Sequence, residues 1–227
     1  MSKKNIINLV KIQVESFRKT DYLLPFFGVA FIMILAFIVS DDLERSISVF
    51  AAISLIIGSQ VPVEDSIMMF FVNNNVNQKI TLPARMNEKF VSIYCVAFIK
   101  MLMWFVSIIL GVGAVCIIGV TKYSVSAAQV ADMYFASLDI SLLFILIYFA
   151  AVISLWQMSS YTYKKIKIKS RTPLVLLTIL MFVLDVYLPD DIADIVMPLY
   201  IIVTSIIFFS MSYRCFRLSQ VVKEKMF

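Results

Sequence analysis

The residue types that usually perform chemistry are scarce in this sequence. The chain contains no histidine, and its three cysteines, Cys95, Cys116 and Cys215, lie far apart with no Cys-x-x-Cys spacing. Histidine acid–base chemistry and ordinary zinc sites need residues that the chain lacks, and these cysteines do not predict a disulfide framework. The sequence also has no Gly-x-x-x-x-Gly-Lys-Ser/Thr phosphate loop, so it cannot bind ATP by that route.

The remaining candidates for chemistry are charged residues near long apolar runs. Lys100, Asp139 and Asp185 each lie within about a turn of the end of such a run, where a side chain reaches the membrane surface at little cost. A proton- or sodium-coupled carrier usually has an ionisable residue near the membrane centre and helices broken by Gly or Pro. Only Gly58 and Pro62 suggest a broken helix, so the sequence disfavours secondary transport.

The elements that must position these residues are membrane helices. Of the 227 residues, 61% are hydrophobic and 15% are charged, and the mean hydropathy is +0.93. Soluble domains are about half apolar and about a quarter charged, so this composition excludes a soluble enzyme. At about 20 residues per spanning helix, the length predicts about six spans in a single domain over residues 1–227, with no large extramembrane domain.

Six apolar runs fit this count, and the fifth is the weakest. The Lys and Arg residues are unevenly distributed. Of the 20, 17 lie before the first run, between runs two and three, between runs four and five, or after the sixth, with Lys100 counted separately at the cytoplasmic edge of the third run. Cytoplasmic loops hold most positive charges, so we expect both termini to be cytoplasmic and the basic surplus to reflect topology, not nucleic-acid binding. The predicted spans are about residues 22–40, 47–63, 101–120, 140–158, 174–188 and 196–212.

The segment before the first span has the pattern of an amphipathic helix. Within residues 3–20, an apolar stripe faces away from most of the basic residues. Such a helix suits the membrane interface, and packing on the cytoplasmic ends of the spans is an equal and compatible alternative. The stripe contains Ile6, Val10, Val14 and Phe17, with Ile7 beside them.

The connection between spans two and three, residues 64–90, has an unusual apolar run. Glu64, Asp65 and Ser66 are typical of a helix start, and six apolar residues follow them. A bulky apolar run on a cytoplasmic loop predicts a docking surface. The alternative is that span two continues to Val72 with a kink at Pro62, which we disfavour because it would place two acids in the helix. The run is Ile67, Met68, Met69, Phe70, Phe71 and Val72.

After this run comes a polar stretch, residues 73–78, and then Leu82-Pro83 before a predicted helix start near Asn87. That helix should pass through Lys100 into the third span. Within the third span, small residues suggest close packing against another helix. These are Gly111, Gly113, Ala114 and Gly119.

This order of elements resembles the small six-span permease subunits of ABC-2-type transporters. In that family the corresponding connection typically reads Leu-Pro-Val-Ser-Arg-x-Glu-(Ile/Val)-Val, and here residues 82–91 read Leu-Pro-Ala-Arg-Met-Asn-Glu-Lys-Phe-Val. Leu82, Pro83 and Glu88 match, whereas Met86 occupies the family's basic position and Arg85 lies one place earlier. Asn8-Leu9-Val10-Lys11, followed by Arg18-Lys19, also resembles the family's opening.

The resemblance implies an all-α integral membrane fold with six spans, an N-terminal interfacial helix and a cytoplasmic coupling helix, here Asp65 to Val72. It implies a bacterial plasma-membrane permease that exports amphipathic or apolar cargo, such as peptide toxins or antimicrobials. The expected partners are cytoplasmic ABC ATPase subunits and a second permease, identical or different. This chain would bind no cofactor and would not be an enzyme, because ATP and Mg²⁺ belong to the ATPase. The alternatives are a membrane-embedded immunity or scaffold protein without turnover, and a secondary transporter.

Overall fold

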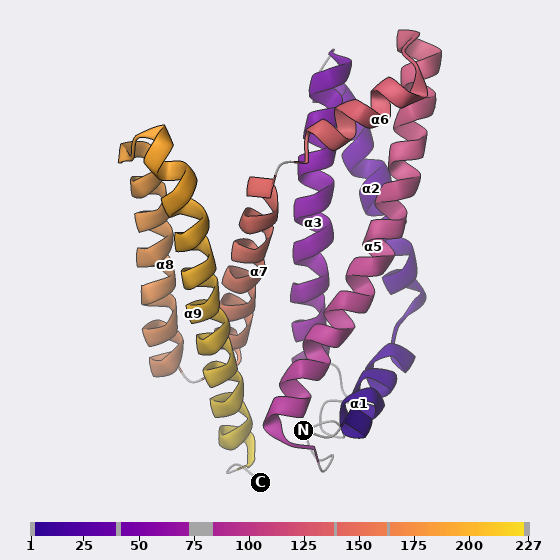
Figure 1. Cartoon of the computed structure of the whole chain (residues 1–227). Coiled ribbons are helices and arrows are strands. Elements are labelled where there is room, and N and C mark those ends of the chain that lie inside the picture. Colours follow the sequence, from indigo (N-terminus) through magenta and orange to yellow (C-terminus); the bar gives the residue numbers. More distant parts are fainter. Residues whose placement is uncertain (1–2, 40–41, 73–83, 139, 163, 225–227) are drawn as a thin grey trace.

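A computed structural model describes residues 3–39, 42–72, 84–138, 140–162 and 164–224. All the regular elements in these residues are α-helices (Figure 1). Long apolar runs form helices in a membrane because each backbone group must find its hydrogen-bond partner within the segment. The helices are α1 (Lys3–Glu15), α2 (Lys19–Val39), α3 (Leu43–Val72), α5 (Met86–Tyr123), α6 (Ala127–Ala136), α7 (Ile140–Ser160), α8 (Lys164–Tyr187) and α9 (Asp190–Glu224).

Five of these helices, α2, α3, α5, α7 and α9, are long and apolar enough to cross a membrane. Their length and composition indicate an all-α, multi-pass membrane protein. The predicted fifth span lies in α8, which does not meet the same criterion over its described residues. Its first turns carry five basic residues, so six spans stays a prediction. These residues are Lys164, Lys165, Lys167, Lys169 and Arg171.

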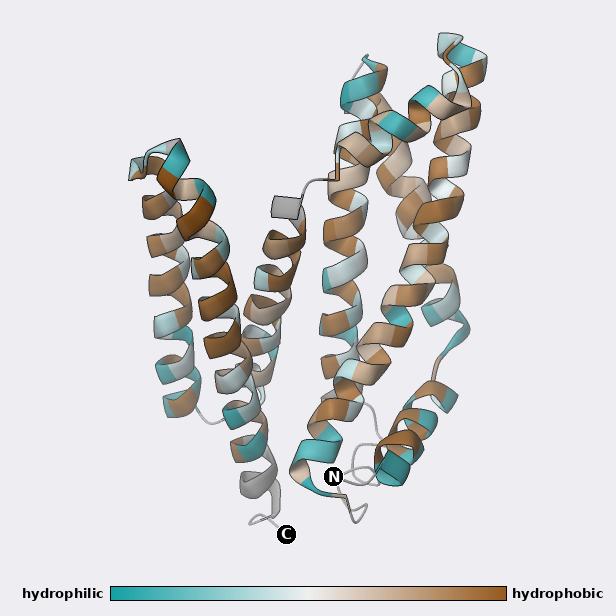
Figure 2. Ribbon diagram, in the orientation of Figure 1, coloured by the Kyte–Doolittle hydropathy of each residue, from teal (hydrophilic) through white to brown (hydrophobic). Residues whose placement is uncertain are grey.

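The hydrophilic residues gather toward the two ends of the bundle, and the helices between the ends are mainly hydrophobic (Figure 2). One end, called the basic end below, holds α1, the last turns of α3, the first turns of α5, the α7–α8 connection and the last turns of α9 (Figure 1). The segments that the sequence assigns to the cytoplasm therefore lie together at this end. The short helix α6 lies at the other end, called the distal end.

Two hydrophobic clusters hold the bundle together, and α3 contributes to both. The basic-end cluster joins the last turns of α3 to α5, α7, α8 and α9, and includes Ile67, Phe70, Ile93, Leu155 and Phe216. The distal cluster joins the first half of α3 to α2, α5 and α6, and includes Val29, Phe50, Trp104, Ile108 and Val130. The groups α2–α6 and α7–α9 therefore meet mainly through the basic half of α3.

The prediction of a separate coupling helix after span two is wrong. α3 runs without interruption from Leu43 to Val72, with Pro62 inside it. Proline is tolerated in membrane helices because neighbouring groups compensate for its lost hydrogen bond. The two acids that argued against one continuous helix are both paired. Gln157 Nε2 donates to Glu64 Oε1 at 2.6 Å, and Lys100 pairs with Asp65.

The N-terminal amphipathic helix is present but shorter than expected, because α1 ends at Glu15 and α2 begins at Lys19. The face that packs against the bundle has Leu9 and Gln13 at its centre, and both are buried. The predicted stripe of Ile6, Val10 and Val14 is half-buried beside them, as is Phe17 in the link to α2. This fits the alternative in which α1 packs on the ends of other helices.

Candidate functional site

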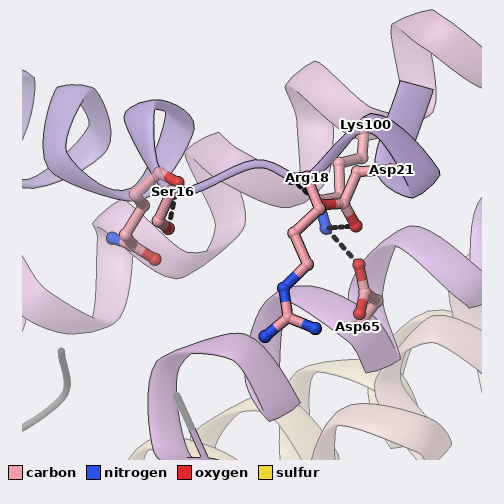
Figure 3. Close-up of polar contacts among 6 residues, drawn as sticks. Ser16, Arg18, Asp21, Asp65 and Lys100 are labelled. Atoms are coloured by element: carbon pink, nitrogen blue, oxygen red, sulfur yellow. Dashed lines mark hydrogen bonds and ion pairs between the residues drawn. The ribbon is translucent and has the colours of Figure 1, made fainter. Parts of the chain in front are cut away.

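A buried lysine at the basic end lies between two carboxylates (Figure 3). Lys100 is on α5, and its side chain is only 6% exposed. Its Nζ atom forms ion pairs with Asp65 of α3 and, at 3.5 Å, with Oδ1 of Asp21 of α2. One ammonium group thus joins three helices, and the set Asp21, Asp65 and Lys100 is called the charge cluster below.

Local sequence places each member of the charge cluster. Asp21 lies in the first turn of α2, where its Oδ2 atom accepts a hydrogen bond from the backbone N–H of Arg18 at 2.6 Å. A carboxylate here satisfies a free N–H group of the helix start. Asp65 lies just after Pro62 in α3, and the ring centroid of Phe17 lies 4.7 Å from Lys100 Nζ. The aromatic face adds a favourable cation–π contact to the two ion pairs.

The charge cluster is an uneven set, with two acids and one base. The side chain of Asp21 is 22% exposed and that of Asp65 is 41% exposed, so water reaches both carboxylates more easily than it reaches Lys100. A buried ammonium is costly without a partner, which makes the acids necessary to Lys100. With all three groups ionised, the cluster carries one net negative charge.

The space around the charge cluster is too small for cargo. A cavity of about 10 Å³ lies among Asp21, Pro25, Pro62, Asp65, Lys100 and Trp104. This volume holds about one water molecule. The described residues contain no group of His, Cys, Asp and Glu side chains that could hold a metal ion. The cluster is therefore suited to holding helices together.

Polar contacts extend from the charge cluster across the basic end. Gln13 Nε2 of α1 donates to Ser92 Oγ of α5 at 3.1 Å, and Asn5 Nδ2 of α1 donates to Glu88 Oε2 at 3.0 Å. Glu88 Oε2 also accepts from the backbone N–H of Arg85 at 3.0 Å, which caps α5. Together with the Gln157–Glu64 bond, these contacts link α1, α3, α5 and α7. These contacts and the charge cluster are called the polar brace below.

The aromatic residues of the predicted docking run lie inside this chain. Phe70 is fully buried and Phe71 is 7% exposed. Phe71 stacks on Tyr161 with ring centroids 4.3 Å apart, and both phenylalanines contact Phe216 of α9. Burial and the nearby Glu64 carboxylate raise the pKa of Tyr161.

The other predicted site residues have mixed positions. Ile67 and Met69 are buried, Met68 is 43% exposed, and Val72 ends α3. Arg85 is exposed and Glu88 is buried. Leu82 and Pro83 lie outside the described residues, as does Asp139, and Asp185 lies within α8. The predicted docking run therefore does not form an exposed apolar surface, although Met68 remains accessible.

Sequence reasoning missed the charge cluster because it treated Lys100 as a side chain reaching the membrane surface. It singled out neither Asp21 nor Gln13. The available signal was the position of Lys100 between apolar stretches of one long helix, with acids at the matching ends of the two preceding spans. Such a lysine needs an acid from a neighbouring helix.

No protein-family model, curated protein or solved structure matches this chain. Its class therefore rests on its own features. Five long apolar helices indicate a multi-pass, all-α membrane protein.

Proposed function

We propose that this chain is the membrane subunit of an ATP-driven exporter that moves amphipathic or apolar cargo, such as peptide toxins or antimicrobials, across the plasma membrane. The resemblance of residues 82–91 and of the N-terminal segment to ABC-2-type permeases supports this class. In the proposal, ATP and Mg²⁺ bind to a separate cytoplasmic ATPase, and a second permease completes the pathway.

The polar brace is the observation that carries this proposal. A permease without its own nucleotide site must receive a movement at one end and pass it to its spans. Such movements travel through packed elements that shift between discrete arrangements. Here Lys100 ties α5 to α2 and α3, and the uninterrupted α3 leads from the basic end into the distal cluster. A displacement at the basic end would therefore move the membrane helices together.

We propose that the ATPase contact lies outside the buried residues of the predicted docking run. Because Phe70 and Phe71 are buried, we assign the contact to exposed residues at the same end. Arg85 is exposed next to the start of α5, and Met68 is exposed on α3. The ATPase would then act on α3 and α5 together.

Site-specific cross-linking tests this assignment. A photoreactive residue at Arg85 should cross-link to an ATPase subunit in the native membrane. The matched control is Phe135, which is 65% exposed on α6 at the distal end and should give no such product. A second measurement uses the purified complex in liposomes. Its rate of ATP hydrolysis should be several-fold higher with cargo than without it. Equal cross-linking from both positions, or normal activity in cells without the ATPase, contradicts the proposal.

Proton-coupled transport is the second candidate, and the charge cluster favours it. Two carboxylates that share one ammonium can bind and release a proton when the helices move. In liposomes that contain this chain alone, a pH gradient should then drive cargo uptake. Asp65→Asn should abolish that uptake, while Asp132→Asn, at an exposed position on α6, should not. Uptake that needs ATP and ignores the pH gradient rules this candidate out.

A further inference from the structure

An open groove of about 750 Å³ lies beside the α7–α8 connection at the basic end. Its lining combines cationic and apolar side chains. Three are cationic and three are apolar, with hydroxyl groups at the margin. The cations are Lys164, Lys167 and Arg171, and the apolar residues are Ile168, Val175 and Leu176.

Arg171 is held in a fixed orientation within this groove. Its Nε atom donates to Ser159 Oγ at 3.0 Å, and its Nη2 atom donates to Ser160 Oγ at 2.7 Å and to the Trp156 carbonyl at 3.3 Å. The guanidinium carbon also lies 3.7 Å from the centre of the Trp156 ring. Over the residues that the structure describes, the Nη1 group has no hydrogen-bond partner. A guanidinium oriented in advance loses little freedom when it binds a phosphate.

The described lining of the groove contains three cations and no acidic side chain. In the described part of the chain, Lys164, Lys167 and Arg171 form no ion pair. Three cations around one groove attract a multivalent or strongly acidic anion. The groove therefore favours a ligand that carries negative charge.

The apolar part of the groove indicates what the anion is attached to. Val175 and Leu176 are 46% and 60% exposed and lie about a turn beyond Arg171, where α8 changes from hydrophilic to hydrophobic (Figure 2). A ligand that fills the groove therefore needs a charged head beside the cations and an apolar tail along α8. We propose that the groove binds the phosphate of an anionic membrane phospholipid, with an acyl chain along Ile168, Val175 and Leu176.

The two tryptophans of the chain allow a direct test. With Trp104→Phe in every variant, Trp156 beside the groove becomes the only fluorophore of its kind. The protein is placed in phosphatidylcholine nanodiscs that contain increasing amounts of brominated phosphatidylglycerol or brominated phosphatidylcholine. Half-maximal quenching should need at least about tenfold less of the anionic lipid, since each surface cation contributes about fivefold.

Charge-removing variants test whether the groove causes this preference. Lys164→Gln with Lys167→Gln should lower the preference several-fold and leaves the Arg171 hydrogen bonds intact. Arg171→Gln should also lower it, and Arg171→Lys should restore it only in part, because lysine lacks the planar fork. Lys122→Gln, at an exposed position near the distal end of α5, is the matched control and should change nothing.

The outcomes separate a lipid from a soluble phosphate. Millimolar inorganic phosphate should weaken anionic-lipid quenching only slightly, because it cannot use the apolar part of the groove. Equal quenching by the two brominated lipids overturns the proposal. So does a preference that survives the double lysine variant, or a Trp156 response to inorganic phosphate with none to phosphatidylglycerol.

Discussion

The two ends of the bundle hold their helices together by different means. At the basic end, charged and amide side chains form the polar brace across five helices. Toward the distal end, α5 instead brings glycines against large side chains. A Cβ atom added at Gly111 would lie 2.6 Å from Val29 Cγ1, and one added at Gly119 would lie 2.6 Å from Val130 Cγ2.

The distal end is therefore held by close apolar packing, whereas the basic end is held by charged and polar contacts. Close apolar packing depends on fit and has little dependence on protonation. The polar brace depends on the charge of Asp21, Asp65 and Lys100, so a change in protonation or in a bound partner can alter it. The distal end is therefore the more constant part, and the basic end is the part that can respond.

The largest expected effect is from a cavity in the basic-end cluster. Phe70→Ala should lower the free energy of unfolding by about 3–5 kcal/mol, because Phe70 is fully buried against α9. Thermal unfolding of the variant and the unmodified protein in detergent measures this loss of stability. Phe27→Ala is the control, since Phe27 is 70% exposed on α2. If Phe70→Ala keeps full stability and only ATPase cross-linking is lost, Phe70 is a docking residue after all.

Removal of the buried ammonium should have the next largest effect. Lys100→Met leaves Asp21 and Asp65 facing each other and should cost about 2–3 kcal/mol, reduced from the fully buried case because water reaches Asp65. Adding Asp21→Asn and Asp65→Asn should restore most of the lost stability. A matched change at Lys122, which is exposed, should cost less than about 0.5 kcal/mol. No recovery in the triple variant would show that the charges are not what joins the helices.

The smallest effect compares two glycines on the same helix. Gly111→Ala should destabilise by about 1–3 kcal/mol, because the new methyl group would also lie 2.9 Å from Phe50 Cζ. Gly113→Ala meets nothing within 4 Å and should be neutral or stabilising by up to about 1 kcal/mol. The same unfolding measurement applies to both. Equal effects would mean that the distal end is not held by close fit.

Much of the fold could be predicted from the sequence, because apolar runs and charge asymmetry reflect the membrane itself. The start of α5 at Met86 lies one residue before the predicted start near Asn87, and the Glu88 cap is a local pattern. The end of α3 could not be predicted in the same way. Pro62 and the acids after it suggested a break, but Gln157 and Lys100 supply partners from elsewhere in the chain.

The candidate site was less predictable, because it depends on contacts between distant residues. Lys100 and Asp65 are 35 residues apart, and the sequence alone does not say that they meet. The small-residue pattern on α5 was similarly ambiguous. Gly111 and Gly119 pack inside the chain, whereas Gly113 faces open space, and all three look alike in the sequence.

The length of α5 has a consequence for the kind of membrane in which the protein works. Its 38 residues extend about 57 Å, but the part from Lys100 to the end extends only about 35 Å, close to the hydrocarbon thickness of about 30 Å. A thicker bilayer would draw the ammonium and its carboxylates below the headgroups, and a thinner one would raise them into water. The cost of burying the Lys100 ammonium therefore changes with bilayer thickness. The free energy of unfolding of the protein should depend on lipid acyl-chain length for this reason.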